Sequence, residues 1–402
     1  MKLPTLVSKV VVCIALFLLA PSLMFANSVA VDCVGVAPGT FVSITAALAS
    51  LSHAGPNDIF VSCNTTDNVL IVNFSQLSIL ATPGTATVTA TNPNQRVLNI
   101  TDSTGIIIDG INFTGGFGIT VNNSGDVQLG EGTIQNSARQ GIITLSSTVD
   151  IFGSPTTTFT IKNNARSGLV STGGNVNLDG GVTITGNGRL GISMMTGHLT
   201  LNGGDGTPAN PDNVISNNGL AGVAIGDTAE LDAGGGNDVL DNGTTGLQVV
   251  HTSTVIWSGG TIIGNKGVGV HIGETSHGEF DTVIITGNGA SSTGLISGFG
   301  EAGGIEVVEN SDLFVDGGVN VSNNLSTGIY VTESSVLSSL GGNTISNNTG
   351  NGYLVTALAV AHFFAPDSGA GNTKEGFECD NSSVLIGASG LDKEKCANVK
   401  IK

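Results

Sequence analysis

Three arginines recur at the same place in a repeating sequence pattern. Arg139, Arg166 and Arg189 each follow, by five residues, an aliphatic residue that opens one repeat unit. The planar guanidinium group binds carboxylates and sulfates through paired hydrogen bonds. If successive units stack, the three arginines form a column on an otherwise acidic surface. Their mutual repulsion must then be offset by carbonyl and carboxylate groups of the turn, or by an acidic glycan with about one sugar per coil.

A second set of polar residues stands two positions after a recurring glycine, where side-chain alternation along a strand points outward. In four neighbouring units this set is Gln248, His271, Glu306 and Tyr330. His271 and Glu306 should be cross-strand neighbours, and such a pair can transfer protons in sugar chemistry. They are the candidate catalytic residues, although a solvated strand face also explains their polarity. An insertion at residues 291–303 adjoins them and could wall a groove.

The repeat that positions both sets has a base period of 23 or 24 residues, lengthened by three insertions. Each unit opens on an aliphatic residue, and these first positions are Ile111, Ile134, Ile161, Ile184, Ile215, Val239, Ile262, Ile285, Val321 and Ile345. One unit alone is too short to bury its apolar side chains, so the units must stack.

Two residue types keep a fixed phase inside the unit. Asparagine occupies the third position after the opening residue at Asn164, Asn187, Asn218, Asn242, Asn265, Asn288, Asn324 and Asn348. Stacked asparagines can bond each other's side-chain amides, which predicts a ladder along one turn. Glycine occupies the seventh position in nine units, from Gly118 to Gly352. There it is expected to supply backbone angles closed to other residues.

The ends of the repeat region carry the remaining structural signals. Cys33 lies near Cys63 in the sequence, and Cys379 lies near Cys396, which predicts two disulfides that close the terminal caps. Apolar residues at helical spacing predict a short amphipathic capping helix over residues 43–52.

The first residues have the pattern of an export signal. Lys2 and Lys9 flank the start, and the apolar run Val10 to Ala20 is too short to span a membrane. Cleavage after Ala30 is expected, with Ala26 as the alternative. The predicted organisation is a signal peptide at 1–30, an N-terminal cap and first coils at 31–96, a β-helix at 97–362 and a C-terminal cap at 363–402.

Without the signal peptide, 11 basic residues face 31 acidic ones, so the net charge is about −20. This acidity argues against a nucleic-acid partner. The cysteines form no CxxC or Cys/His grouping, so neither a metal site nor a cofactor is predicted. Asp179, Asp232 and Asp316 precede glycines at strand ends, where capping of turn amides explains them better than calcium binding.

Coils such as Gly180-Gly181-Val182-Thr183-Ile184-Thr185-Gly186-Asn187 give the chain a family resemblance. Over roughly residues 40–360 it resembles the right-handed parallel β-helix proteins of the pectin-lyase-like group. The resemblance implies an all-β fold with one right-handed parallel β-helix of about ten or more coils. That group contains polysaccharide lyases, glycoside hydrolases and adhesin-like proteins. The galacturonan-hydrolase motifs Asn-Thr-Asp, Asp-Asp, Gly-His-Gly and Arg-Ile-Lys do not occur in this sequence.

These observations predict a secreted or cell-surface module that binds glycans or partner proteins without catalysis. The alternatives are a polysaccharide lyase or glycoside hydrolase acting on an acidic polysaccharide, and a structural surface component. An extracellular polysaccharide is the expected partner, and no membrane span is expected. The expected ligand-binding residues are Arg139, Arg166, Arg189, Gln248, His271, Glu306 and Tyr330.

Overall fold

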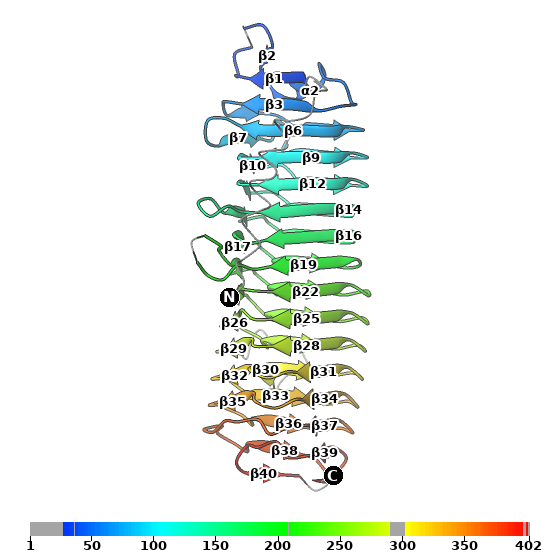
Figure 1. Cartoon of the computed structure of the whole chain (residues 1–402), viewed down its shortest axis with the longest axis vertical. Coiled ribbons are helices and arrows are strands. Elements are labelled where there is room, and N and C mark those ends of the chain that lie inside the picture. The colour runs from blue at the N-terminus through cyan, green and yellow to red at the C-terminus, as the bar shows by residue number, and fades with distance from the viewer. Residues whose placement is uncertain (1–26, 36, 208, 290–301, 397–398, 401–402) are drawn as a thin grey trace, which may run out of the picture.

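The computed structural model is an elongated stack of coils whose strands pair in parallel with those of the coils above and below (Figure 1). It describes residues 27–35, 37–207, 209–289, 302–396 and 399–400. Nearly all the regular structure is β, and the predicted parallel β-helix is confirmed.

A typical coil contributes one strand to each of three columns. The first column is a sheet of 12 strands among the described residues. Its members are β4 (Thr65–Thr66), β7 (Ala86–Thr89), β10 (Ile111–Thr114), β13 (Thr133–Gln135), β15 (Phe159–Lys162), β17 (Val182–Thr185), β20 (Asn213–Ser216), β23 (Asn237–Leu240), β26 (Thr261–Ile263), β29 (Ile284–Thr286), β32 (Asn320–Ser322) and β35 (Thr344–Ser346).

The second column follows the first after a short turn. It contains β5 (Val69–Val72), β8 (Leu98–Thr101), β11 (Ile119–Asn122), the starts of β14 (Ile142–Phe152) and β16 (Leu169–Asp179), β18 (Ile192–Met194), β21 (Val223–Ile225), β24 (Leu247–Val249), β27 (Val270–Ile272), β30 (Ala302–Val307), β33 (Thr327–Val331), β36 (Tyr353–Val355), β38 (Phe377–Cys379) and β40 (Glu394–Lys395).

The third column completes each coil. It contains β1 (Asn27–Val31), β3 (Asn57–Val61), β6 (Ser75–Ala81), β9 (Thr104–Asp109), β12 (Gly125–Gly130), the ends of β14 and β16, β19 (His198–Asn202), β22 (Glu230–Gly234), β25 (Thr254–Ser258), β28 (His277–Asp281), β31 (Asp312–Val315), β34 (Val336–Ser339), β37 (Val360–Phe363), β39 (Val384–Ile386) and β41 (Val399–Lys400). The short strand β2 (Thr40–Phe41) pairs with β1.

The opening residues of the repeat lie in register in the first column. Ile161 pairs with Ile184, and Ile184 with Ile215 in the next coil. The same pairing continues from Val239 to Ile345, and all of these side chains are buried. Each apolar residue therefore packs on its counterpart in the next coil, which makes one core continuous along the stack. Trp257 likewise pairs with Phe280, and both are fully buried in that core.

The predicted asparagine ladder is confirmed. From Asn164 to Asn348, each side-chain Nδ2 donates to Oδ1 of the next asparagine at 2.9–3.1 Å. The ladder ends one coil later than predicted, at Asn372. Each backbone N–H in the row also donates to the next Oδ1, so the amides replace water inside a buried turn.

The predicted reason for the recurring glycine was wrong. Apart from Gly118, these glycines do not have a positive φ. At Gly191, a Cβ would instead lie 2.5 Å from the carbonyl oxygen of Gly222 and 2.8 Å from Nδ2 of Asn218. The glycine is required because the ladder and the next coil leave no space for a side chain.

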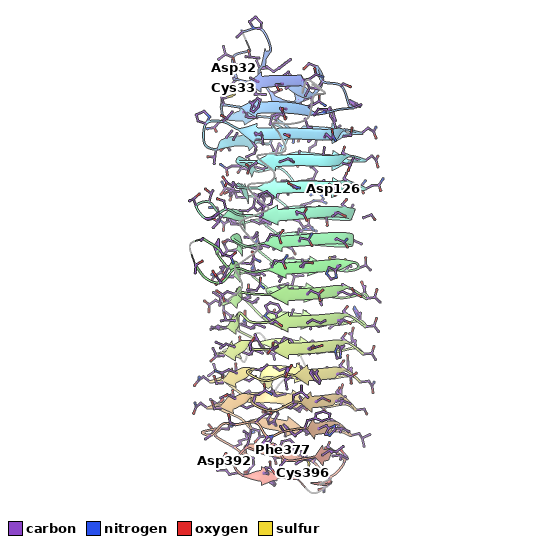
Figure 2. All side chains as sticks on the ribbon, in the orientation of Figure 1. Asp32, Cys33, Asp126, Phe377, Asp392 and Cys396 are labelled. Carbon is purple, nitrogen blue, oxygen red and sulfur yellow. A yellow bond between two sulfur atoms is a disulfide. The ribbon has the colours of Figure 1, made fainter. Side chains whose placement is uncertain are left out.

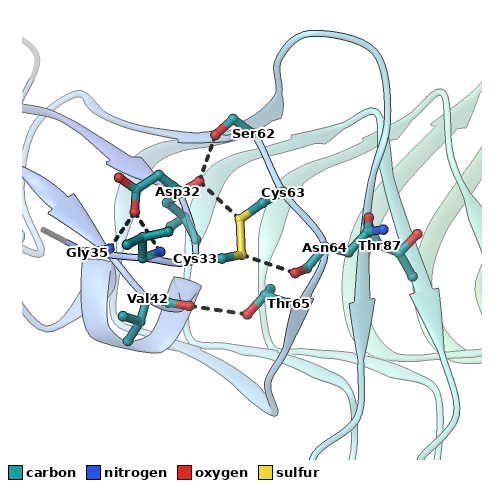
Figure 3. Close-up of a disulfide and its surroundings, with 11 residues drawn as sticks. Asp32, Cys33, Gly35, Val42, Ser62, Cys63, Asn64, Thr65 and Thr87 are labelled. Carbon is teal, nitrogen blue, oxygen red and sulfur yellow. Dashed lines mark hydrogen bonds between the residues drawn. A yellow bond between two sulfur atoms is a disulfide. The ribbon is translucent and has the colours of Figure 1, made fainter. Parts of the chain in front are cut away.

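Both predicted disulfides are present, one near each end of the stack (Figure 2). Cys33 follows β1, and Cys63 follows the paired strand β3 (Figure 3). Disulfides of this kind indicate an exported protein. Within the described ranges, no helix is both long and apolar enough to span a bilayer.

Helix α2 (Ile44–Leu48) is shorter than the predicted residues 43–52. Ser43 caps it by accepting a hydrogen bond from the N–H of Ala46. Its side chains Ile44, Ala47 and Leu48 are buried, and the helix lies next to β1, β2, β3 and β5. Its role as a cap of the core stays a prediction. The signal peptide lies largely outside the described residues, but a cut after Ala26 would leave β1 whole, whereas a cut after Ala30 would remove most of it.

Candidate functional site

The three arginines of the predicted column lie on successive coils, in the turn between the first and second strand columns. We call this turn the arginine turn. The backbone N–H of Arg166 donates to the carbonyl of Arg139 at 3.1 Å, and that of Arg189 donates to the carbonyl of Arg166 at 3.2 Å. All three side chains are exposed. Three cations therefore project from one edge at the spacing of the coils, about 4.8 Å.

The fourth arginine of the chain, Arg96, lies on the same turn, two coils before Arg139. Between them lies Phe117, whose backbone N–H donates to the carbonyl of Gln95 at 2.8 Å. Nη1 of Arg96 donates to the carbonyl of Phe117, and the guanidinium of Arg139 lies 4.5 Å from the centroid of its ring. The sequence analysis missed Arg96 because the first coils depart from the repeat phase. Its position between β7 and β8 was the available signal.

None of the arginines forms an ion pair in the described part of the chain. The ion pairs there join carboxylates to histidines or to Lys395. Arg139 has the ring of Phe117 as its partner, a cation–π contact. The guanidinium groups of Arg166 and Arg189 have no hydrogen bond to another described residue. These two side chains are therefore available to an external anion.

Carboxylates gather on a different turn, between the second and third strand columns. Backbone hydrogen bonds connect Thr228 to His251, Thr252 to Glu274 and Thr275 to Glu309 in consecutive coils. His251 lies between two acids on this turn, 3.2 Å from Asp227 and 2.5 Å from Glu274. The sequence analysis did not identify this acidic turn, which lies on a different edge of the coils from the arginines.

The second predicted column is in the expected register. Gln248 pairs with His271, His271 with Glu306 and Glu306 with Tyr330. Nδ1 of His271 lies 2.8 Å from Oε2 of Glu306, so the predicted cross-strand neighbours do contact each other. Gln248 and Tyr330 are partly exposed, and the Tyr330 hydroxyl lies 3.2 Å from Oγ1 of Thr356.

The expected exposure of His271 and Glu306 was wrong. His271 is 7% exposed and Glu306 only 1%. Burial raises the pKa of Glu306 above its ordinary value, and the hydrogen bond from His271 partly opposes this rise. The insertion at 291–303 lies largely outside the described residues. Burial leaves little of either side chain on the surface, and the ligand-binding and catalytic roles of these residues stay predictions.

Within the described ranges, no cluster of three or more His, Cys, Asp or Glu side chains could hold a metal ion. Asp232, considered above for calcium, lies 3.4 Å from Nε2 of His198, and Glu230 lies 3.4 Å from Nδ1 of the same ring. These groups form a partly exposed charge network on the third strand column.

No family model matches this sequence, and neither does any curated protein. Among solved structures, the mannuronan C-5 epimerase AlgE6 A-module of Azotobacter vinelandii matches 86% of this chain and 94% of its own, at 14% identity and a TM-score of 0.40. The catalytic domain of a GH87 α-1,3-glucanase in complex with tetrasaccharides matches 94% of this chain and 68% of its own, at 12% identity and a TM-score of 0.44. Likeness at this level carries no argument about activity.

Proposed function

We propose that this protein is a secreted module that binds an acidic glycan along the arginine turn and performs no chemistry on it. The observation that carries the proposal is the column Arg139, Arg166 and Arg189, exposed on consecutive coils and without a carboxylate partner among the described residues. Guanidinium groups bind carboxylates and sulfates, and a polyuronate or sulfated glycan presents such groups at a regular spacing.

The position of the acidic turn supports the same proposal. An acidic protein repels an acidic polymer over most of its surface, and the acidic turn strengthens this repulsion. The arginine turn is then the edge where such a polymer can approach. Because the arginines are exposed, the interaction should weaken as salt rises.

The test is binding of the exported protein to polygalacturonate, alginate, heparin and neutral dextran, measured by surface plasmon resonance at two salt concentrations. The triple variant R139Q/R166Q/R189Q should bind the preferred acidic glycan at least about tenfold more weakly. A matched control removes three positive charges from the last coils, at Lys374, Lys393 and Lys395. Equal losses in both variants, or no loss in the arginine variant, would overturn the proposal.

A glycan-modifying enzyme is the second candidate, favoured by the 2.8 Å contact between His271 and Glu306. It predicts new reducing ends or unsaturated products when the protein is incubated with the same polysaccharides. Turnover that disappears in E306Q would establish it. Retention of one glycan without any product would select the binding module over both the enzyme and a purely structural role.

A further inference from the structure

A hollow of about 420 Å³ lies at the N-terminal end of the arginine turn. It spans the turn and the outward side of the second strand column, where Leu70 of β5 pairs with Asn99 of β8. Arg96 and Phe117 line it from the turn, and Asn68 and Asn94 complete its rim.

The wall that carries Arg96 is held by a dense set of hydrogen bonds. Nδ2 of Asn68 donates to the carbonyl of Arg96 at 2.7 Å, and its Oδ1 accepts from the N–H of Asn92 at 2.6 Å. Oδ1 of Asn92 in turn accepts from the N–H of Asn94 at 3.0 Å. The loop therefore presents Arg96 and Asn94 in a defined arrangement before any ligand arrives.

Arg96 is a half-buried cation without a compensating carboxylate. Its Nη1 donates to the carbonyl of Phe117, and no described acid forms an ion pair with it. Burial lowers the pKa of Arg96, and the nearby charge of Arg139 lowers it further. A bound anion would stabilise the charged form of Arg96 against both burial and the charge of Arg139, because it would interact with the guanidinium in place of the water that burial removes.

The rest of the lining suits a sugar ring. The side chain of Leu70 is 53% exposed, and part of Phe117 is also exposed, which offers apolar surface to the C–H faces of a pyranose. The amides of Asn94 and Asn99 line the same hollow and can bond hydroxyl groups.

We propose that this hollow binds the terminal acidic sugar of the glycan, with its carboxylate or sulfate on Arg96 and its ring against Leu70 and Phe117. The rest of the polymer then runs over Arg139, Arg166 and Arg189. This inference rests on the proposed function and adds to it that one end of the chain is recognised. A short oligosaccharide should therefore bind without engaging the distal arginines.

The test uses isothermal titration of the exported protein with a galacturonate trisaccharide, a sulfated heparin disaccharide and maltotriose. One of the two acidic probes should bind, which distinguishes carboxylate from sulfate, whereas maltotriose should not. Arg96→Gln should weaken that binding at least about tenfold, because a charge-assisted contact is lost. The distal variant R166Q/R189Q should keep oligosaccharide binding but bind the polymer more weakly.

A second variant avoids the structural bond between Arg96 and Phe117. Leu70→Glu places a carboxylate in the hollow from an exposed position, where it competes with the ligand for Arg96. Its matched control is Leu340→Glu, because Leu340 is also exposed, at 39%, and lies far from the hollow. Leu70→Glu should abolish oligosaccharide binding, and Leu340→Glu should leave it unchanged.

The two proposals fail in different ways. If the polymer binds through the distal arginines while Arg96→Gln and Leu70→Glu bind oligosaccharides like the parent protein, recognition of a terminus is wrong and the proposed function stands. Binding of the polymer without binding of either acidic oligosaccharide also overturns the terminal site alone. If neither polymer nor oligosaccharide binds, both proposals are wrong.

Discussion

Replacement of Asn265 by alanine tests whether the asparagine ladder holds the coils in register. Asn265 is fully buried, and its side chain takes part in four hydrogen bonds. Nδ2 donates to Oδ1 of Asn288 at 3.0 Å and to the carbonyl of Val239 at 3.1 Å. Oδ1 accepts from the backbone N–H and from Nδ2 of Asn242, both at 3.0 Å.

The size of the effect follows from these contacts. A net hydrogen bond contributes about 1 kcal/mol, and a buried group that loses its partner costs about 1–3 kcal/mol. Alanine removes four bonds and leaves two donors of Asn242 and the carbonyl of Val239 without these partners inside the stack, whereas Oδ1 of Asn288 still accepts from the backbone N–H of residue 265. We expect the free energy of unfolding to fall by about 3–5 kcal/mol.

Urea-induced unfolding followed by circular dichroism measures this change. Asn175→Ala is the matched control, because Asn175 is exposed on β16 and its side chain has no hydrogen bond to a described residue. Its free energy of unfolding should change by less than about 0.5 kcal/mol. A loss below about 1 kcal/mol for Asn265→Ala would show that the amide row does not hold the coils together.

Asn265→Asp sharpens the test, because it preserves the shape but replaces the donor with an oxygen. That oxygen would face the carbonyl of Val239 and Oδ1 of Asn288, so the ionised variant should be no more stable than the alanine variant at neutral pH. Burial raises the pKa of such a carboxyl group. The folded state then retains its proton to higher pH, and part of the lost stability should return as pH falls.

Three further predictions concern other buried positions. Gly191→Ala should lower the free energy of unfolding by about 1–3 kcal/mol in thermal denaturation, because the added Cβ has no space. Gly234→Ala is the control and should change it little, because an added Cβ there has no atom within 4 Å. Tyr353→Phe should cost about 1.5–3 kcal/mol in urea, because the buried carboxylate of Asp367 loses a 2.6 Å hydrogen bond. Glu306→Gln should remove a decline in stability with rising pH. Because the pKa of Glu306 is raised in the folded protein, its contribution is present below the pKa of the unfolded chain and is lost as pH rises through the higher pKa of the folded state.

The residue register was predictable from the sequence because the repeat has a strict internal phase. The offset of asparagine from the opening residue specified which side chains stack, and the pairing of Ile184 with Ile215 followed even across an insertion. The same phase predicted the arginine column and the contact between His271 and Glu306. A period of this kind predicts to which side of its strand each side chain points and which residues it pairs with in the next coil.

The period does not predict how deeply a side chain is buried. Alternation along β27 points His271 away from the core, but the side chain is buried because the following turn lies against it. A Cβ on Gly273 would lie 2.9 Å from Nε2 of His271 and 3.3 Å from Cγ2 of Val308. The hydrogen bond between His271 and the paired Glu306 offsets part of the free-energy cost of burying these polar groups. Turn packing of this kind has no signature in the repeat.

A second polar row was also missed, because it uses mixed residue types. Asn343 donates to Oδ1 of Asp367 from its backbone N–H at 3.0 Å and from Nδ2 at 2.9 Å. The other oxygen of Asp367 accepts from Ser339 at 2.8 Å and from Tyr353 at 2.6 Å. An aspartate is therefore tolerated in a buried row where donors face both oxygens. The main ladder offers the second oxygen only acceptors.

The ladder and the proposed binding edge belong to the same turn, which connects stability to function. Asn164 and Asn187 lie two residues before Arg166 and Arg189, and their side chains are joined by a 2.9 Å hydrogen bond. The buried amides thus hold the backbone from which the exposed guanidinium groups project. The arginines are already held at coil spacing before a polymer binds, so binding requires little further ordering of the backbone. An exposed cation on a mobile loop would lack this advantage, and for that reason a modest number of arginines can suffice on an otherwise acidic molecule.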